Sequence, residues 1–431
     1  MSVAEPVDRR PRRGPAGLPR LLAGRGAASS SLSVHLDRYG QLPGPLDERF
    51  ITAVEQSGLR GKGGAAFPTA TKMRSVANGR GPRVVVVNAK ESEPASGKDL
   101  LLLTELPHLV LDGATVAAEA VGAHEVIVAT DRTYDGARSS IERAIEERLG
   151  RRRDPKVRVV GMPSRYVAGE ERALVHFLNG GDAKPTSAPR PSERGVNGRA
   201  TLVQNAETMA DLALIARFGP EWYRGCGLPD EPGSVLLTVG GAVAQPGVLE
   251  VELGTPVSAV IEAAGGLTTD VSAFLFGGYF GAWLPEKSAW DLPVSHRALA
   301  DAGAGLGGGV VFAFPANRCG LAETARVARW LASETAGQCG PCVYGLAAIA
   351  DELTKLAKSQ HRKDSVERLT RWANDVTGRG ACRYPDGAAR FVTSALDAFA
   401  ADVHQHWSKQ PCRTQPNPIL PLPASRAEGW R

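Results

Sequence analysis

The chain has 431 residues, of which 43% are hydrophobic and 23% charged, and its formal net charge at pH 7 is +5. Such a length accommodates about two to four domains with their own cores. The composition argues against a membrane span, because no apolar stretch approaches the required length of about 18 residues. The small, scattered charge does not indicate a nucleic-acid-binding protein. Six cysteines in so long a chain indicate metal or redox chemistry rather than a disulfide framework.

Both ends of the chain are rich in proline. Residues 1–45 are predicted to form a flexible N-terminal arm, with a dense basic run at Arg9–Arg13. A twin-arginine export signal would continue into an apolar stretch, which Pro19 and Arg20 interrupt, so the sequence does not predict export. Residues 406–431 are predicted to be a disordered tail.

Residues 46–230 alternate helical patterns with apolar strands. The predicted strands are 83–89, 125–131 and 156–163, and the predicted helices are 46–57, 106–121, 136–149 and one that begins near 169. The first helix ends at Gly58, which suits a left-handed cap. Continuous apolar strands that alternate with helices are typical of a parallel sheet covered on both faces, so an α/β domain is predicted.

The pattern changes after residue 230. Residues 231–318 predict a small α+β domain with a hairpin, one helix and a further strand. Residues 319–405 are almost entirely helical in pattern, and their predicted helices are 320–336, 341–358, 362–376 and 387–404. Cys339 and Cys342 lie between the first two of these helices, and Cys382 lies between the last two.

The glycine-rich segment GLRGKGGAAF, residues 58–67, separates the first helix from the first strand. Its glycines would expose backbone amides to a phosphate or a flavin, while Arg60, Lys62 and Lys72 supply positive charge. No Walker A frame fits this loop. Taken alone, the segment suits a plain structural turn equally well.

Two acidic clusters follow in positions typical of ligand sites. Asn88, Glu91 and Glu93 come just after a predicted parallel strand, where α/β proteins bind ligands. Glu170 and Glu171 begin a helix, where carboxylates also occur simply to complement the helix dipole. Two such clusters together with a cationic glycine-rich loop favour a cofactor pocket over surface charge.

The cysteines predict a metal centre. Between Cys339 and Cys342 a proline makes the turn rigid so that both sulfurs converge, and Cys382 lies in a loop flanked by glycine and proline. Zinc would require further ligands, commonly a second C-x-x-C pair, which this sequence lacks. An iron–sulfur cluster, which often takes a remote thiolate, fits these three residues better.

These motifs occur in a recognisable order. From about residue 18 to 404 the chain resembles the NADH-oxidising flavoprotein of respiratory complex I, its F subunit, and the related proteins of NAD-linked hydrogenases and formate dehydrogenases. The resemblance rests on the segments GLRGKGGAAFPTATK, VVNAKESEPASGKDLLL, ELPHLV, RYVAGEERAL, QNAETMADL and GQCGPCVYG. It implies a Rossmann-like α/β domain that binds FMN, a small β-grasp domain of the SLBB kind, and a C-terminal four-helix domain that holds a [4Fe–4S] cluster.

The resemblance also implies roles for single residues. The family's FMN contacts correspond to Gly61, Gly63, Lys72, Asn88, Glu91, Tyr166, Gly169, Glu170, Glu171 and Asn205. Phe67 and Glu93 match residues that receive NADH, and Glu93 is the one candidate catalytic residue. In the family NADH donates a hydride to FMN, from which single electrons pass to the cluster.

Four positions depart from the family on the NADH and flavin side. Lys90 replaces an aspartate, so a cation is expected at the flavin edge in place of an anion, and Gln204 replaces the first of two asparagines. Ser75 and Arg190 stand where aromatic residues are expected to sandwich the adenine of NADH. The sequence therefore leaves NAD(P)H open as the electron donor.

One cluster ligand is also missing. The family has a C-x-x-C-x-x-C run plus a remote cysteine; Cys339, Cys342 and Cys382 match three of these ligands, and Ala336 replaces the first. The cluster either has three protein ligands or recruits another cysteine. Cys319 is the candidate fourth ligand if the chain before the first helix folds beside the cluster loop, and a buried structural role is its alternative.

Three functions follow as hypotheses. The leading one is an oxidoreductase that passes electrons from NAD(P)H through FMN and a [4Fe–4S] cluster to a partner protein, such as a ferredoxin-like or other electron-transfer subunit. The alternatives are an electron-transfer relay with the same fold and cluster but another donor, and a noncatalytic binding module. We expect a cytoplasmic protein, either free or peripheral to a membrane complex, with no membrane span of its own and no nucleic-acid partner.

Overall fold

The computed structural model describes residues 17–26, 28–151, 153–410, 418–423 and 429–431. They form two compact units, between which the chain passes several times. Unit 1 takes its residues from 1–90, 99–161 and 189–234, and unit 2 from 91–98, 162–188 and 235–431. Within the predicted domain 46–230, the segments 91–98 and 162–188 pack with unit 2.

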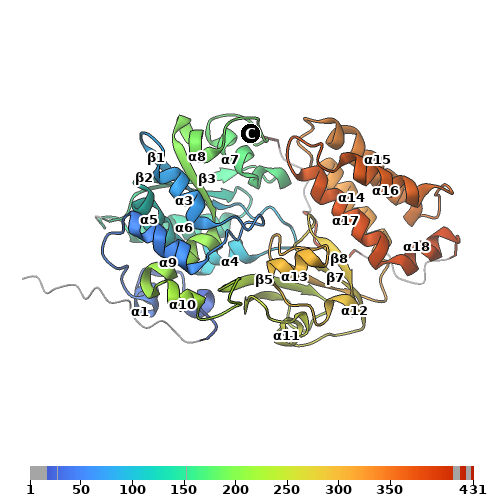
Figure 1. The fold of residues 1–431 in the computed structure, drawn as a ribbon, viewed down its shortest axis with the longest axis horizontal. Coiled ribbons are helices and arrows are strands. Elements are labelled where there is room, and N and C mark those ends of the chain that lie inside the picture. Colours follow the sequence, from blue (N-terminus) through green and yellow to red (C-terminus); the bar gives the residue numbers. More distant parts are fainter. Residues whose placement is uncertain (1–16, 27, 152, 411–417, 424–428) are drawn as a thin grey trace, which may run out of the picture. The chain divides into compact units, whose positions relative to one another are not determined.

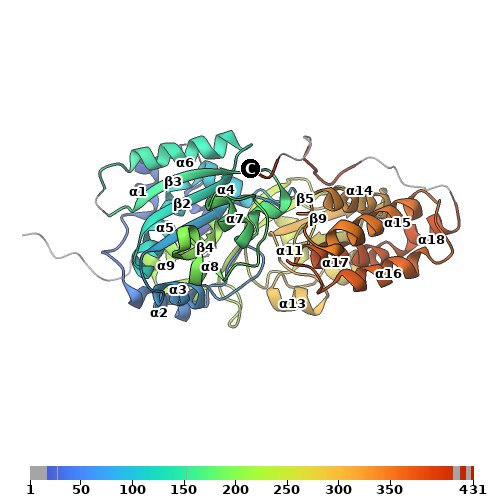
Figure 2. The ribbon, with the colours of Figure 1, turned by 90° about the horizontal axis from the view of Figure 1, so that it is seen from above.

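Unit 1 is built on a four-stranded sheet in the order β3-β2-β1-β4 (Figures 1 and 2). Its strands are β1 (Arg83–Ala89), β2 (Ala123–Asp131), β3 (Lys156–Met162) and β4 (Ala200–Asn205). β1 runs parallel to β2, as predicted, and also to β4, which is not among the predicted strands. The four consecutive valines at 84–87 are all buried, which explains why β1 is a continuous apolar run rather than an alternating one.

Helices cover both faces of this sheet, with α6 along one side and α2 and α3 along the other (Figure 2). They are η1 (Leu21–Gly24), α1 (Leu32–Tyr39), α2 (Glu48–Ser57), α3 (Thr69–Ala77), α4 (Lys98–Glu105), α5 (Pro107–Val121), α6 (Asp135–Glu147), α8 (Pro191–Arg194), η3 (Val196–Gly198), α9 (Ala206–Phe218) and α10 (Pro220–Arg224). α2 ends at a left-handed Gly58, as predicted. α5 and α9 cross so closely that a Cβ on Gly113 would lie 1.7 Å from the Met209 carbonyl oxygen, so this crossing requires glycine.

The predicted N-terminal arm is wrong for most of residues 17–45. Leu21 and Tyr39 are buried, and the Tyr39 hydroxyl donates to the Leu21 carbonyl at 3.0 Å. The Arg20 guanidinium lies 4.3 Å from the centre of the Trp222 ring on α10. These contacts fold the segment onto unit 1, whereas the basic run at Arg9–Arg13 lies outside the described residues.

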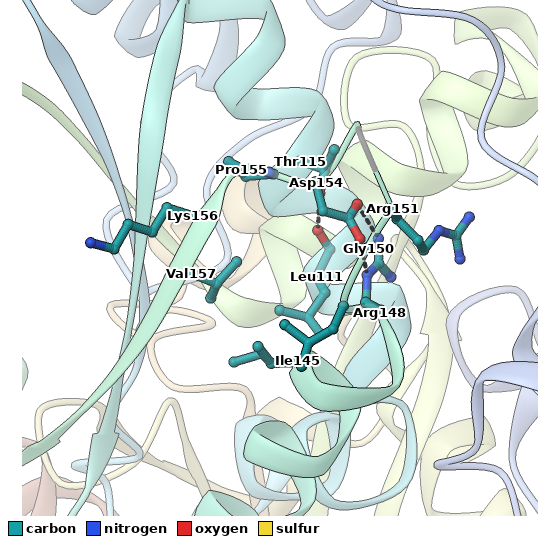
Figure 3. Close-up of a pocket in the computed structure, with 11 residues that line it drawn as sticks. Leu111, Thr115, Ile145, Arg148, Gly150, Arg151, Asp154, Pro155, Lys156 and Val157 are labelled. Carbon is teal, nitrogen blue, oxygen red and sulfur yellow. Dashed lines mark hydrogen bonds and ion pairs between the residues drawn. The ribbon is translucent and has the colours of Figure 1, made fainter.

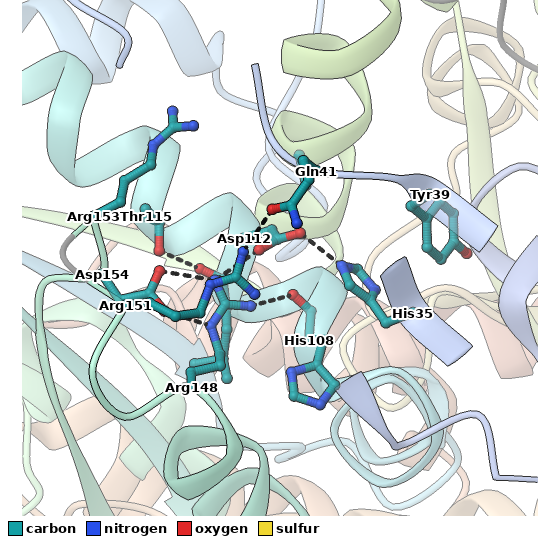
Figure 4. Close-up of polar contacts among 12 residues, drawn as sticks. His35, Tyr39, Gln41, His108, Asp112, Thr115, Arg148, Arg151, Arg153 and Asp154 are labelled. Atoms are coloured by element: carbon teal, nitrogen blue, oxygen red, sulfur yellow. Dashed lines mark hydrogen bonds and ion pairs between the residues drawn. The ribbon is translucent and has the colours of Figure 1, made fainter. Parts of the chain in front are cut away.

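A buried ionic network centres on Asp112, in the middle of α5 (Figure 4). Its carboxylate lies 2.7 Å from His35 Nε2 and accepts from Arg148 at 2.7 Å and from Arg217. These partners come from α1, the end of α6 and α9, so one carboxylate joins four helices. Burial alone would raise the pKa of Asp112, but the hydrogen bond from His35 and the charges of Arg217 and Arg148 hold it below its ordinary value.

A cavity of about 220 Å³ adjoins this network (Figure 3). Leu111, Ile145 and Val157 contribute apolar wall. Arg148 also lines the cavity, and it is already held by Asp154 at 2.9 Å as well as by Asp112. The charge of this arginine is therefore committed to the fold of unit 1.

Unit 2 contains a five-stranded sheet in the order β6-β5-β9-β7-β8. Its strands are β5 (Ser234–Gly241), β6 (Gly247–Glu252), β7 (Val271–Phe276), β8 (Ala282–Pro285) and β9 (Val310–Pro315). β5 and β9 are parallel, while β7 is antiparallel to β8 and to β9. Alternate residues of β7 serve two cores: Phe274 and Phe276 pack with α11 (Val257–Ala263), and Ala273 and Leu275 pack with the C-terminal helices.

The remaining helices of unit 2 are η2 (Tyr166–Gly169), α7 (Glu171–Leu178), α12 (Glu286–Ala289), α13 (His296–Asp301), α14 (Gly320–Ser333), η4 (Pro341–Leu346), α15 (Ala347–Ala357), α16 (Ser365–Val376), α17 (Tyr384–Ala398) and α18 (Ala400–Trp407). α14, α15, α16 and α17 pack as a closed set, because α14 contacts α17 as well as α15. The predicted helix 387–404 is two helices separated at Phe399.

The predicted disordered tail is wrong for the parts of it that the structure describes. Leu420 is only 2% exposed, and its backbone N–H donates to Glu323 at 2.7 Å. Farther on, the Trp430 ring lies under the Arg165 guanidinium at 4.3 Å, and its carbonyl accepts from the Ala183 N–H at 2.8 Å. The aromatic and aliphatic residues between the prolines supply this packing.

In the described part of the chain, no single helix has the length and apolarity needed to cross a membrane. α4 and α5 meet that test only as a pair, and they are bent by 97° at their junction.

Asp112→Asn is expected to lower the free energy of unfolding of the protein by about 3–5 kcal/mol, because it leaves the buried Arg217 without its counter-ion and Arg148 with Asp154 alone. The lowered pKa of Asp112 means that its contribution is present above the ordinary carboxyl pKa of 3.8 and is lost as the pH falls below it. Urea denaturation at pH 7 and at pH 3.5 measures both effects.

Glu147→Gln is the matched control, since Glu147 pairs with His108 at 3.2 Å but remains 43% exposed. It should cost less than about 1 kcal/mol. Equal effects of the two substitutions at pH 7 would show that the Asp112 network does not hold unit 1 together.

Candidate functional site

The carboxyl edge of the unit 1 sheet brings two predicted site residues together. Asn88 at the end of β1 is in register with Asn205 at the end of β4. The Asn205 amide donates to Asp99 at 2.5 Å and to the Asn88 carbonyl at 3.4 Å, and its oxygen caps α9 through the Glu207 N–H. The asparagine side chain is thus held in place by three contacts within unit 1.

The glycine-rich loop lies at this same edge. It is closed at its base by the Gly61 N–H, which donates to the Phe67 carbonyl at 2.9 Å. A Cβ on Gly61 would lie 3.5 Å from that carbonyl, and one on Gly63 would lie 3.4 Å from the Cβ of Asn205. Neither glycine has a positive φ, unlike Gly64 at +102°. The packing of unit 1 therefore does not require glycine at 61 or 63, and their bare backbone is open to a ligand.

The cations of this region are placed differently from the prediction. Lys62 is buried, and its ammonium group donates to the Ser234 carbonyl at 2.8 Å, so it does not supply charge to a ligand. Lys90 lies 3.0 Å from Asp131, with each side chain 2% exposed. Burial would raise the pKa of Asp131, but the Lys90 charge and the Thr133 hydrogen bonds lower it. The expected extra cation at position 90 is therefore neutralised within unit 1.

Phe67, Ser75 and Arg190 are the positions compared with the residues that receive NADH in the family. All three lie on or beside α3 in unit 1. Phe67, 51% exposed, comes just before α3, and Ser75 lies on the exposed side of that helix. Arg190 is exposed at the start of α8, which packs against α3. Lys72 lies half-buried on α3 as well. One exposed aromatic thus precedes the helix that carries Ser75, and Arg190 begins a helix packed against it.

In unit 2, Glu93 is a buried acceptor at the centre of an aromatic cluster. Its carboxylate accepts from the Tyr166 hydroxyl at 2.6 Å, from the Tyr279 N–H at 2.7 Å and from the Ala95 N–H at 3.2 Å. A Cβ on Gly278 would lie 2.3 Å from this carboxyl group, so the glycine is required. Burial raises the pKa of Glu93 to about 7, although the hydrogen bonds oppose the shift.

Tyr166 is fixed at both ends, and one of its anchors is absent from the predicted site. Besides the contact of its hydroxyl with Glu93, its backbone N–H donates to Glu334 at 3.0 Å. Glu334 caps the end of α14 and lies 3.4 Å from Arg165. No motif in the sequence distinguishes Glu334 from any carboxylate at the end of a helix.

The second acidic cluster stands at the turn from η2 to α7. Glu170 caps α7 by accepting from the backbone N–H groups of Arg172 at 3.0 Å and Ala173 at 2.9 Å. Gly169 ends η2, and Glu171 begins α7. Burial raises the pKa of Glu170. The simple role of a helix cap is thus present. Glu170 is half-buried, and its charge adds to burial in raising the pKa of Cys382. Glu91, in the separate segment 91–98, is buried.

Three of the predicted thiols lie together. Burial, together with the neighbouring Cys339 and Cys382, raises the pKa of Cys342 to about 12. The Cys339 carbonyl accepts from the Cys342 N–H at 3.1 Å, which forms the turn that the C-x-P-C spacing predicts. Ala336 lies half-buried three residues upstream. Among the described residues, no three His, Cys, Asp or Glu side chains are arranged to hold a single metal ion.

Cys319 does not join these thiols, so its prediction as fourth ligand is corrected. It caps the opposite end of α14, whose 14 residues span about 21 Å. Its sulfur accepts from the Ala322 N–H at 3.3 Å and lies 3.3 Å from His406 Nε2 on α18. The chain before α14 continues from β9 and does not fold back beside the cysteine loop.

Three family models match the chain in order, and they define a class of redox subunit. The Nuo51 FMN-binding domain matches residues 54–214, the SLBB domain 236–278, and the iron–sulfur binding region of NADH-ubiquinone oxidoreductase-F 322–406. The last of these covers the three clustered thiols.

Whole-chain comparisons agree. The F subunit of NADH-quinone oxidoreductase from Streptomyces coelicolor is 30% identical over 386 residues, covering 85% of this chain and 84% of its own. The Aquifex aeolicus protein is 30% identical over 376 residues, with 84% and 87% covered. A chain of an NAD+-reducing [NiFe]-hydrogenase in the air-oxidized state matches with a TM-score of 0.80 at 29% identity, covering 93% of this chain and 69% of that one. The chain belongs to the F-subunit family of NADH-quinone oxidoreductases, which confirms the resemblance.

Glu93→Gln is expected to change the pH dependence of stability. Because the folded pKa of about 7 lies above the ordinary 4.5, the wild-type contribution is full below pH 4.5 and is lost as the pH rises through 7. The difference in the free energy of unfolding, variant minus wild type, should therefore increase between pH 5 and pH 8.5 by an amount on the order of 1–3 kcal/mol. Thermal denaturation at both pH values detects this as a rising difference in Tm.

The substitution of the exposed Glu48 by Gln controls for the loss of one carboxyl group. A Glu93→Gln difference that stays constant with pH would contradict a raised pKa for Glu93. Any cost of placing an amide among three donors is independent of pH and does not affect this comparison.

Proposed function

We propose that this protein is a flavin and iron–sulfur oxidoreductase that passes electrons from NAD(P)H, through FMN and an iron–sulfur cluster, to a partner protein. The observation that carries the proposal lies within unit 2. Burial raises the pKa of Cys382, expected to bind the cluster, and the charge of Glu170, expected beside the flavin, acts in the same direction. The family models that match these two residues support the same assignment.

The flavin contacts are proposed separately for each unit. In unit 1 they are Gly61, Gly63, Lys72, Asn88 and Asn205, and in unit 2 they are Glu91, Tyr166, Gly169, Glu170 and Glu171. The bare glycine backbone supports close approach of a planar ring or phosphate. Bound FMN supplies the conversion between two-electron and one-electron transfer.

The finer description of the fold is part of the proposal. We infer a Rossmann-like domain around the parallel strands of unit 1, a β-grasp domain around the mixed sheet of unit 2, and a four-helix domain formed by α14–α17. The strand orders and the closed packing of those helices support it.

One buried and two half-buried thiols that lie together support a cluster rather than a surface role for these cysteines. Metal binding requires thiolates, and iron would have to displace the protons that burial retains on Cys342 and Cys382. Cys339, Cys342 and Cys382 are the proposed ligands.

NAD(P)H is proposed to stack on Phe67. Glu93 is proposed to lie on the nucleotide side, where its Oε2 atom accepts from the Tyr166 hydroxyl and from the Tyr279 N–H. The acceptor is proposed to be an electron-transfer subunit, and the site of action the cytoplasm, free or at the periphery of a membrane complex. The second candidate, a relay with another donor, is favoured by Ser75 and Arg190 at the positions of two aromatics.

Anaerobic purification of the full chain, with assay of flavin, iron and sulfide, tests the function. Addition of NADH should then decrease the flavin absorbance. Bound cofactors that do not respond to NADH would favour the relay, and colourless protein would favour the noncatalytic module.

Gly63→Ala sharpens this test. Its methyl group meets only an ordinary contact within the protein, so folding should be unchanged, while flavin content should fall by about tenfold or more if the ring lies against this backbone. Gly136→Ala, at a position of α6 with open surroundings, is the control. Equal flavin content in both variants would argue against the loop as the flavin site.

The double substitution of Ser75 and Arg190 by Phe should lower the Kd for NADH. Each base–aromatic stack contributes about 1–3 kcal/mol, which corresponds to about 30-fold to 10⁴-fold for two. Titration of the flavin absorbance with NADH measures it, and the single variants separate the two positions. Weaker binding in Arg190→Phe alone would instead identify Arg190 as a nucleotide ligand.

A further inference from the structure

The cysteine loop presents three thiols and one methyl group. Cys339, Cys342 and Cys382 lie together, whereas Ala336 occupies the position at which the same spacing would place a fourth ligand. Cys319, the remaining described cysteine of unit 2, lies at the far end of α14 and contacts His406. An iron atom in front of Ala336 therefore receives no further cysteine from the described part of unit 2.

Contacts on both sides hold Ala336 in position. On its N-terminal side, Glu334 is bound by the Tyr166 N–H and lies beside Arg165. On its C-terminal side, the Cys339 carbonyl accepts from the N–H groups of Cys342 and Val343 at 3.1 and 3.0 Å. A loop fixed two residues before and three residues after Ala336 has little freedom to bring another residue to that place.

The other polar groups near the thiols are engaged elsewhere. Glu170 accepts two backbone N–H groups of α7. Asp386 accepts from the Gly378 N–H at 2.8 Å and from Arg383 at 2.9 Å. The Tyr384 hydroxyl donates to the Leu331 carbonyl at 2.8 Å. Each of these side chains already has a structural partner within unit 2.

Solvent reaches the loop at this point. Gly337 and Gln338, directly after Ala336, are exposed, as is Gly340. Gly337 has a φ of +66° and carries no side chain that could cover Ala336. Small ions and molecules therefore have access to the side of the loop that carries the alanine.

We propose, on the basis of the proposed function, that this protein binds a [4Fe–4S] cluster through three cysteines, and that the iron facing Ala336 takes an exchangeable small ligand. The ligand class is a small anion or thiolate that binds iron, such as hydroxide or cyanide. This iron is the labile one. When a one-electron oxidant such as ferricyanide removes one electron, [4Fe–4S]2+ gives [3Fe–4S]+ and a free Fe2+.

Three full-length proteins, purified anaerobically, test the proposal: the wild type, Ala336→Cys, and Ala332→Cys as the control. The control adds a thiol on α14 one turn upstream, outside the ligand spacing. After one equivalent of ferricyanide, wild type and control should lose about one iron of four and show the EPR signal of an oxidised three-iron cluster. Ala336→Cys should retain all four irons. Cyanide should change the EPR spectrum of the reduced wild type but not that of Ala336→Cys.

Retention of four irons by the oxidised wild type would overturn the proposal, because a protein donor would then fill the fourth position. A cluster that assembles only in Ala336→Cys would overturn it also, since three cysteines would be insufficient. Absence of iron and sulfide from all three proteins would refute the cluster assignment of the proposed function itself.

Discussion

The candidate site depends on the placement of Tyr166. Its hydroxyl donates to Glu93 at 2.6 Å, and its backbone N–H donates to Glu334 at 3.0 Å. Through these bonds the segments 91–98 and 162–188 become part of unit 2, although their neighbours in the sequence belong to unit 1. Tyr166 also stacks edge-on with Phe280 at 4.7 Å, so the tyrosine fills a defined aromatic cage.

This arrangement links the acidic residues to the thiols by way of α14. Glu334 ends that helix and receives Tyr166, and the cysteine loop begins just after it. Any displacement of η2 would therefore move the start of the loop that carries Cys339 and Cys342. Rigid positioning of this kind is what electron transfer between fixed centres requires, because the protein contributes placement and electrostatics rather than chemistry.

Many of the elements and the turn between Cys339 and Cys342 could be predicted from the sequence, because apolar periodicity and local spacing determine them. The strand β1, the Gly58 cap of α2 and the C-x-P-C turn are such local features. Contacts distant in sequence could not be predicted. Lys62 is predicted to be a ligand-binding cation because the sequence gives no sign of its actual partner, Ser234, which lies 172 residues away. The tail residue Leu420 is predicted to be disordered because nothing in the sequence pairs it with Glu323.

Two departures from the family differ in how this chain accommodates them. Lys90 puts a cation in the interior of unit 1, and a buried charge without a partner costs several kcal/mol. Folding therefore requires compensation, and Asp131 provides it at 3.0 Å. Ala336 puts a methyl group at a half-exposed loop position, where it costs the fold nothing. No structural pressure demands a substitute thiolate, and the described part of unit 2 supplies none. The change at position 336 therefore acts on the cluster alone, and its effect lies in the coordination of iron rather than in the stability of the helices.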